Sequence, residues 1–206
     1  MKDEQEKLKE NFDVVGRIFY NGNFVLAETK TRSLIKKYSK VPVLYNLLGM
    51  CLSAQNKTEE AIKSYEKAIS LNPKFAIAYN NLGNIYRNKK QDLEMAKELF
   101  EKSIFHEPKF ALAYNNLGNL MKDLNNFQQA EQNFKEAISC DPKNYVIYTN
   151  LGITYNILGE FDKAKECFEN SIKINPHFML AHRNLSALIK YSEKNSHLLQ
   201  MEKINL

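Results

Sequence analysis

Apolar positions recur three and four residues apart along most of the chain, which is the spacing of one face of an α-helix. Tyr79, Leu82 and Tyr86, for example, share such a face. The pattern is interrupted at intervals, and each interruption lies near a glycine or a proline. Turns are too rare for a chain of short strands, because 206 residues contain only 7 Gly and 5 Pro. The pattern predicts an all-α fold.

The helical pattern repeats every 34 or 35 residues. The first helix of each repeat carries a tyrosine, a leucine and then a glycine, and these glycines are Gly49, Gly83, Gly118 and Gly152. The second helical stretch ends near a proline, namely Pro73, Pro108, Pro142 and Pro176. A glycine inside a helix costs about 1 kcal/mol relative to alanine. We therefore expect each glycine to allow close approach of the second helix, opposite small residues such as Ala61, Ala130 and Ala164.

These motifs resemble the tetratricopeptide repeat, and residues 42–178 match its pattern almost position by position. The resemblance implies antiparallel helix pairs stacked into a right-handed superhelical solenoid, whose first helices line a concave groove. One extra residue in the stretch 88–93 predicts a bulged loop between the two helices of that repeat. We expect a single domain with a degenerate repeat at 8–41, repeats at 42–75, 76–110, 111–144 and 145–178, and capping helices within 179–206, at 179–191 and 195–204.

Composition and charge limit the classes of partner. The net charge of +5 is mild, and basic residues are interspersed with acidic ones, so nucleic-acid binding is not predicted. No stretch approaches the roughly 18 apolar residues of a membrane span. The first residues are charged, unlike those of a signal peptide. We expect a cytoplasmic protein without a membrane partner, whose separated cysteines Cys51, Cys140 and Cys167 are buried thiols.

The sequence contains no motif typical of an enzyme, a cofactor site or a metal site. It lacks a glycine-rich phosphate loop, a nucleophile elbow and an HExxH motif, and its four histidines are scattered. The recurring aromatic residues keep a fixed register with the glycines, which predicts a place in the core and not a surface for stacking bases. We therefore expect no catalytic activity, cofactor or metal.

The predicted functional surface is the face of the first helices that turns away from their partner helices. In the family that this chain resembles, that face lines the groove, and here it is rich in amides and mildly basic. Helical spacing places twelve candidate peptide-binding residues on it: Asn80, Asn81, Asn84, Arg87, Asn115, Asn116, Asn119, Lys122, Asn150, Asn156, Arg183 and Asn184.

Four of these asparagines, Asn81, Asn116, Asn150 and Asn184, stand two positions before a repeat glycine or the serine that replaces it. An amide both donates and accepts, so a ladder of amides can pair with successive peptide units of an extended chain. The ladder is similar to the one in the repeat domain of O-linked N-acetylglucosamine transferases. Asparagine is also the family's usual residue here, so a purely structural ladder is the alternative.

Aliphatic residues near the start of each first helix allow two interpretations. They recur at Val43, Ile77, Leu112, Val146 and Leu180. They form either an apolar edge of the groove or a packing contact between neighbouring repeats.

The resemblance implies a protein-protein interaction scaffold that binds an extended, polar to acidic peptide segment of a partner in its groove. The alternative is a substrate-recruiting repeat domain of a larger sulfotransferase or glycosyltransferase, since residues 190–201 are similar to the stretch that follows the repeats in sulfotransferase-linked proteins. Self-association through an exposed end is a third possibility.

Overall fold

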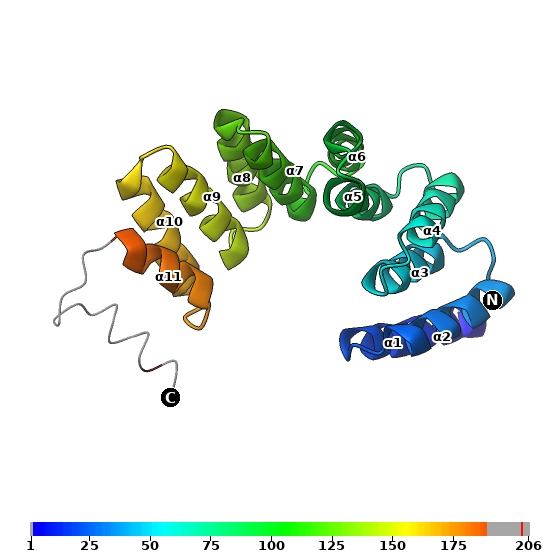
Figure 1. Ribbon diagram of the computed structural model, residues 1–206. Helices are drawn as coiled ribbons and strands as arrows, with labels where there is room; N and C mark the ends of the chain where they lie inside the picture. Colours follow the sequence, from blue (N-terminus) through cyan, green and yellow to red (C-terminus); the bar gives the residue numbers. More distant parts are fainter. Residues whose placement is uncertain (1, 189–202, 204–206) are drawn as a thin grey trace. The chain divides into compact units, whose positions relative to one another are not determined.

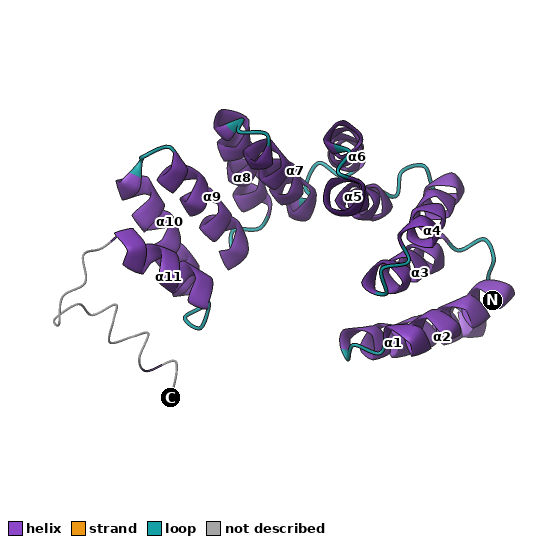
Figure 2. Ribbon diagram, viewed as in Figure 1, coloured by secondary structure: helices purple, strands orange, loops and turns teal. Residues whose placement is uncertain are grey.

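The computed structural model describes residues 2–188 and 203, and these residues are helical apart from short connections (Figures 1 and 2). The chain divides into two compact units, Met1–Pro108 and Lys109–Leu206. The all-α fold of successive helix pairs is confirmed for the described part. Its elements are α1 (Lys2–Tyr20), α2 (Phe24–Lys37), α3 (Pro42–Ala54), α4 (Thr58–Leu71), α5 (Ala76–Ile85), the π-helical turn η1 (Tyr86–Lys90), α6 (Leu93–His106), α7 (Ala111–Asp123), α8 (Phe127–Cys140), α9 (Tyr145–Ile157), α10 (Phe161–Ile174) and α11 (Met179–Leu188).

The turn inside each helix pair contains one residue in the left-handed conformation, which glycine and asparagine tolerate best. The next helix then begins with a capping side chain in several pairs; Asp92, for example, accepts a hydrogen bond from the backbone N–H of Met95. Since α1 and α2 are joined by the same kind of turn as the later pairs, they form a pair of the same design. The left-handed residues are Gly22, Asn56, Gln91, Asn125 and Gly159.

The extra residue of the second clear repeat lies inside a helix, so the predicted bulged loop is wrong. The helix α5 ends at Ile85, and the chain continues in the π-helical turn η1 before Gln91 leads to α6. A π-helical turn closes its hydrogen bonds from residue i to residue i+5 and therefore holds one residue more than an α-helical turn. The extra residue is therefore accommodated in the last turn of the helix and not in the loop.

The core of each clear repeat is built around a glycine of the first helix and an aromatic ring of the second. A methyl group on Gly152 would lie 2.6 Å from Cε1 of Phe168. The ring, and not the predicted alanine, therefore occupies the space beside the glycine. The same contact joins Gly49 to Tyr65, Gly83 to Phe100 and Gly118 to Phe134. These four rings are at most 3% exposed, which confirms their predicted place in the core.

A second recurring contact ties the first helices α3, α5 and α11 to the loops before them. The Tyr79 hydroxyl donates to the carbonyl of Pro73 at 3.2 Å. In α11, His182 takes the place of the tyrosine, and its Nε2 lies 2.8 Å from the carbonyl oxygen of Pro176. His182 is 1% exposed and therefore has a structural role.

The described part of the C-terminal region is the helix α11, which corresponds to the helix predicted at 179–191 and is described as far as Leu188. The further helix predicted at 195–204 lies outside the described residues, except for Lys203.

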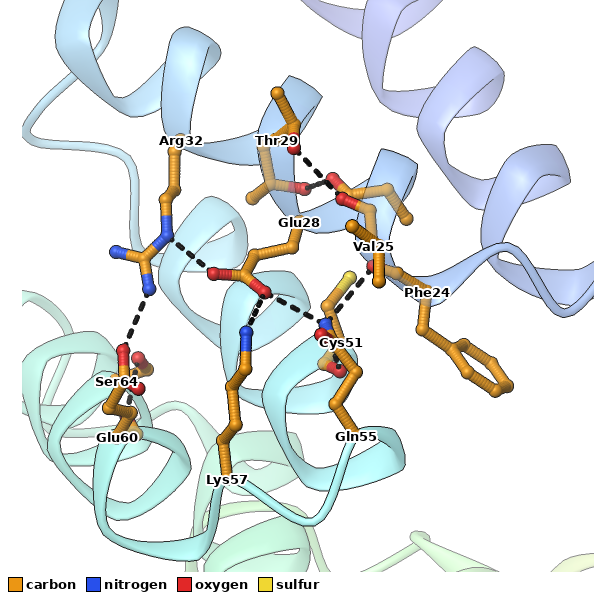
Figure 3. Close-up of polar contacts among 12 residues, drawn as sticks. Phe24, Val25, Glu28, Thr29, Arg32, Cys51, Gln55, Lys57, Glu60 and Ser64 are labelled. Atoms are coloured by element: carbon orange, nitrogen blue, oxygen red, sulfur yellow. Dashed lines mark hydrogen bonds and ion pairs between the residues drawn. The ribbon is translucent and has the colours of Figure 1, made fainter.

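A charged network joins the first helix pair to the second (Figure 3). Glu28 of α2 is 9% exposed and accepts hydrogen bonds from Arg32 Nε, Gln55 Nε2 and Lys57 Nζ, each at 2.8 Å. Arg32 Nη2 also donates to Glu60 of α4 at 2.9 Å. Burial alone would raise the pKa of Glu28, but the three hydrogen bonds lower it to about 2. A single carboxylate thus links α2 to the turn between α3 and α4.

We expect Gly152→Ala to destabilise the protein by roughly 1–3 kcal/mol, because the added methyl group would overlap the buried ring of Phe168. Gly16→Ala in α1 is the matched control, since a methyl group there would have no neighbour within 4 Å. Alanine is the better helix former, so this control should stabilise the chain by up to about 1 kcal/mol. Thermal unfolding followed by circular dichroism measures the change in stability of both variants. A stabilising Gly152→Ala would contradict the contact between glycine and ring.

We expect Glu28→Gln to cost up to about 3 kcal/mol at pH 7, because a pKa that falls from 4.5 to about 2 corresponds to about 1.4 kcal/mol per unit. The folded pKa lies below the unfolded pKa. The stabilisation is therefore complete above pH 4.5 and is lost as the pH falls towards 2.

The difference in unfolding midpoint between the wild type and Glu28→Gln should accordingly narrow between pH 5 and pH 2. Glu98→Gln removes an exposed ion pair with Lys102 in the same unit and serves as the control, with little effect at any pH. A constant difference across this range would show that the Glu28 carboxylate contributes no charge-dependent stability.

Candidate functional site

The first helices of neighbouring repeats contact each other within each unit. In the first unit α3 contacts α5, and in the second unit α7 contacts α9 and α9 contacts α11. We use the term first-helix face for the side of α3, α5 with η1, α7, α9 and α11 that turns away from the second helix of the pair. This face is where the sequence places the candidate residues.

In the first unit, the first-helix face contains a pocket of about 290 Å³. Asn81 and Asn84, both predicted from the sequence, lie in it together. Sequence reasoning missed most of the other lining residues, although Met50 and Ala54 follow Gly49 at the same distances as Asn84 and Asn88 follow Gly83. The pocket is lined by Phe19 of α1, Met50, Ser53 and Ala54 of α3, Tyr65 of α4, and Asn81, Asn84, Ile85, Asn88 and Lys89 of α5 and η1.

Three predicted residues are buried. Asn80 has no exposed surface, and Asn115 and Asn116 are each 8% exposed. The prediction that Asn80 faces an accessible groove is therefore wrong. The reason is its position three residues before the glycine, where the equivalent residues Asn46 and Asn115 are buried as well. The other candidates are half-buried (Asn81, Asn84, Arg87, Asn119, Lys122, Asn150 and Asn184) or exposed (Asn156 and Arg183).

The asparagines form hydrogen bonds between repeats. Asn81 Nδ2 donates to Asn46 Oδ1 at 3.0 Å, and Asn150 Nδ2 donates to Asn115 Oδ1 at 2.9 Å. In both cases the donor stands two positions before the glycine of its own repeat. The acceptor belongs to the preceding repeat and stands three positions before the glycine there. This bond fixes the orientation of the donating amide. Among residues 2–188, no side chain or backbone group donates to the Oδ1 of Asn81 or Asn150, which leaves these oxygens to accept from a ligand.

The hydrogen-bonded series is interrupted at α11. The residue that would accept from Asn184 is Thr149, which is fully buried and donates to Ser171 Oγ at 2.8 Å. Within the described part of the chain, Asn184 Nδ2 consequently has no hydrogen-bond partner. At the other end of the series, Leu47 replaces the asparagine and lies in an apolar cluster with residues of α1 and α2.

Aliphatic side chains border the first-helix face. Ile77, Leu112 and Val146 are 37% to 48% exposed. Of the two interpretations given above, this exposure favours an apolar edge over a packing contact between repeats.

The charges of this face are positive in the first unit. The turn η1 carries Arg87, Lys89 and Lys90. Lys89 Nζ donates to Asn56 Oδ1 at 2.8 Å, whereas Lys90 forms an ion pair with Glu59. The turn that holds the insertion thus also brings one basic side chain, that of Lys89, to the pocket.

Cys51 and Cys167 are buried as predicted, whereas Cys140 is half-buried, so the prediction of a buried thiol is wrong there. Burial raises the pKa of Cys51 to about 11 and that of Cys167 to about 12, so both remain protonated at neutral pH. Across the described residues, no group of three or more His, Cys, Asp and Glu side chains is placed to hold a metal ion. None of the helices from α1 to α11 is both long and apolar enough to cross a bilayer.

Sequence comparisons identify repeats of the same kind, and two of the matches coincide with the predicted repeats at 111–144 and 145–178. The profile described as "TPR repeat" matches residues 52–90, and the profile described as "Tetratricopeptide repeat" matches residues 111–144 and 145–178. The uncharacterized protein ycf37 of Pyropia yezoensis is 32% identical over 37% of this chain and 42% of its own length. A chloroplastic tetratricopeptide repeat domain-containing protein, PYG7 of Arabidopsis thaliana, is 38% identical over 23% of this chain and 16% of its own length. The chain thus spans less than half of either relative.

Solved structures share the fold at low sequence identity. PilF of Pseudomonas aeruginosa has a TM-score of 0.79 at 15% identity, over 97% of this chain and 92% of its own. The thermophilic TPR protein TTC0263 of Thermus thermophilus has a TM-score of 0.74 at 18% identity, over 87% and 98%. YrrB, described as a TPR protein with an unusual peptide-binding site, has a TM-score of 0.62 at 23% identity, over 84% and 90%.

The matched profiles together cover more than half of the chain, and the helix pairs, the repeat glycines and the shared fold agree with them. The chain belongs to the tetratricopeptide repeat family, whose members in general act as scaffolds for interactions with protein or peptide partners.

Proposed function

We propose that this protein binds an extended, polar to acidic peptide segment of a partner protein on its first-helix face. The observation that carries the proposal is the orientation of Asn81 and Asn150. Their Nδ2 groups are held by the preceding repeat, while their Oδ1 atoms accept no hydrogen bond from a described residue. Fixed acceptors of this kind suit the N–H groups of an extended backbone, because they recognise the chain irrespective of its side chains.

The composition of the face supports a peptide and not a nucleic acid or a membrane. Amide side chains dominate it, and the aromatic rings of the second helices are buried and unavailable for stacking bases. The basic residues of η1, together with Lys122 and Arg183, favour a ligand that carries carboxylates. We propose that the chain acts by binding alone, without catalysis.

The compartment that we propose is the cytoplasm. The chloroplast location in the name of the Arabidopsis relative makes a plastid the alternative.

Selection of random linear peptides on the immobilised protein should enrich binders, whose affinities can then be measured by fluorescence titration. We expect Asn81→Ala combined with Asn150→Ala to weaken binding by roughly tenfold or more. Each lost hydrogen bond is worth on the order of 0.5–1.5 kcal/mol, and about 1.4 kcal/mol corresponds to a factor of ten.

The buried acceptors offer a matched control. Asn46→Ala combined with Asn115→Ala breaks the same two hydrogen bonds between repeats but keeps the Oδ1 atoms that would meet the ligand. This pair should lower stability to a similar extent and affinity much less. Equal losses of affinity in the two double variants would mean that the ladder is structural. Undiminished affinity with a steep dependence on salt would mean that the face recognises charge.

A further inference from the structure

The pocket of the first unit differs from the rest of the first-helix face in its apolar wall. Phe19, Met50, Ala54 and Ile85 line it together with the ring of Tyr65. Tyr65 is 3% exposed, and burial raises its pKa, so its hydroxyl is neutral. In the other three clear repeats, phenylalanine stands at this position. The pocket therefore combines an apolar wall with the uncharged hydroxyl groups of Tyr65 and Ser53.

The pocket is large enough for one bulky side chain. Its volume is about 290 Å³. A cavity of about 150 Å³ in another protein holds a benzene molecule. A phenylalanine, leucine or methionine side chain therefore fits, whereas most drug-sized ligands need more space.

One cation stands at the edge of this pocket. Of the residues that the structure describes, Lys89 is the only charged one in the lining, and its Nζ donates to the neutral amide of Asn56. The neighbouring Lys57 and Lys90 are paired with the carboxylates of Glu28 and Glu59. Among the charges around the pocket, that of Lys89 is therefore the one that a ligand carboxylate can neutralise.

The extra residue of this repeat gives the pocket its chemistry. Asn88 and Lys89 belong to η1, the π-helical turn that absorbs the insertion. In the second unit, where α7 and α9 contain no such turn, the fifth position after the glycine carries Asp123 or Ile157. Short π-helical segments are frequent at functional sites, since they redirect side chains without breaking the helix.

We propose that this pocket binds a bulky apolar side chain of the partner's peptide segment, with an aspartate or glutamate next to it that pairs with Lys89. The inference rests on the proposed function, because the same peptide lies along the first-helix face. The amides Asn81 and Asn84 contact its backbone, the pocket takes the apolar side chain, and Lys89 contacts the carboxylate. The ligand class is thus an acidic linear segment with one aromatic or aliphatic anchor.

The test uses a displayed library of random linear peptides, selected on the wild type and on Ala54→Phe. Ala54 is exposed at the end of α3, so the added ring can fill the pocket without entering the core. Ser70→Phe places the same ring on an exposed position of α4 that does not line the pocket and is the matched control. Wild type and control should enrich peptides with a bulky apolar residue beside Asp or Glu, and Ala54→Phe should lose the apolar preference.

Two further measurements do not depend on whether Ala54→Phe folds. Replacing the apolar residue of an enriched peptide with alanine should weaken its binding to the wild type at least tenfold. Lys89→Gln should weaken binding several-fold, remove most of its salt dependence and end the preference for acidic neighbours. Enriched peptides without an apolar anchor would contradict the role of the pocket as the site for an apolar side chain. The same anchor preference on Ala54→Phe would contradict it too. Either result would leave the proposed function intact. No enrichment at all would overturn the proposed function itself.

Discussion

The close contact between a glycine of the first helix and an aromatic ring of the second is the constraint on which the rest of the structure depends. At four positions there is no room for a single methyl group between them. The contact fixes both the separation of the two helices and the rotation of the first helix about its axis. Once that rotation is set, the residues on the opposite side of the first helix are turned away from the second helix. The first-helix face is therefore a consequence of the packing.

The period, the helix pairs and the general position of this face could be predicted from the sequence, because glycines, prolines and apolar spacing repeat. The identity of the group beside each glycine could not, since spacing gives the face of a helix but not the reach of a side chain. Phe168 reaches Gly152 across the helix pair, whereas the smaller Ala164 does not fill that space. The π-helical turn could not be predicted from the sequence either. An extra residue can be accommodated in a loop or in a helix, and only the backbone hydrogen bonds distinguish the two.

Neighbouring residues of the same type can also have different roles, which a sequence pattern does not reveal. Asn80 and Asn81 are adjacent asparagines, yet Asn80 is fully buried and Asn81 lines the pocket. Successive residues of a helix point about 100° apart, so one faces the neighbouring helix and the other the open side. Glu28 was missed for another reason. Its partners Gln55 and Lys57 are 27 and 29 residues away, and the first pair lacks the glycine that marks the repeats.

We infer two roles for the amide series. Its donors hold adjacent repeats together, and the acceptors that remain are kept in one orientation for a ligand. Preorganisation of this kind lowers the entropy that binding would otherwise cost. In the first unit, the π-helical turn contributes Asn88 and the cation Lys89 to the lining of a pocket beside the amides. The two units therefore present different chemistry on equivalent helices.

The binding surface can be located from the side-chain amide resonances of the ¹⁵N-labelled protein, recorded during titration with a selected peptide. We expect the Nδ2 signals of Asn81, Asn84 and Asn150 to shift with peptide concentration, while that of Asn133 on the second helix α8 stays unchanged. Shifts confined to residues of α4, α6, α8 and α10 would place the ligand on the second helices and contradict the assignment of the first-helix face as the binding surface.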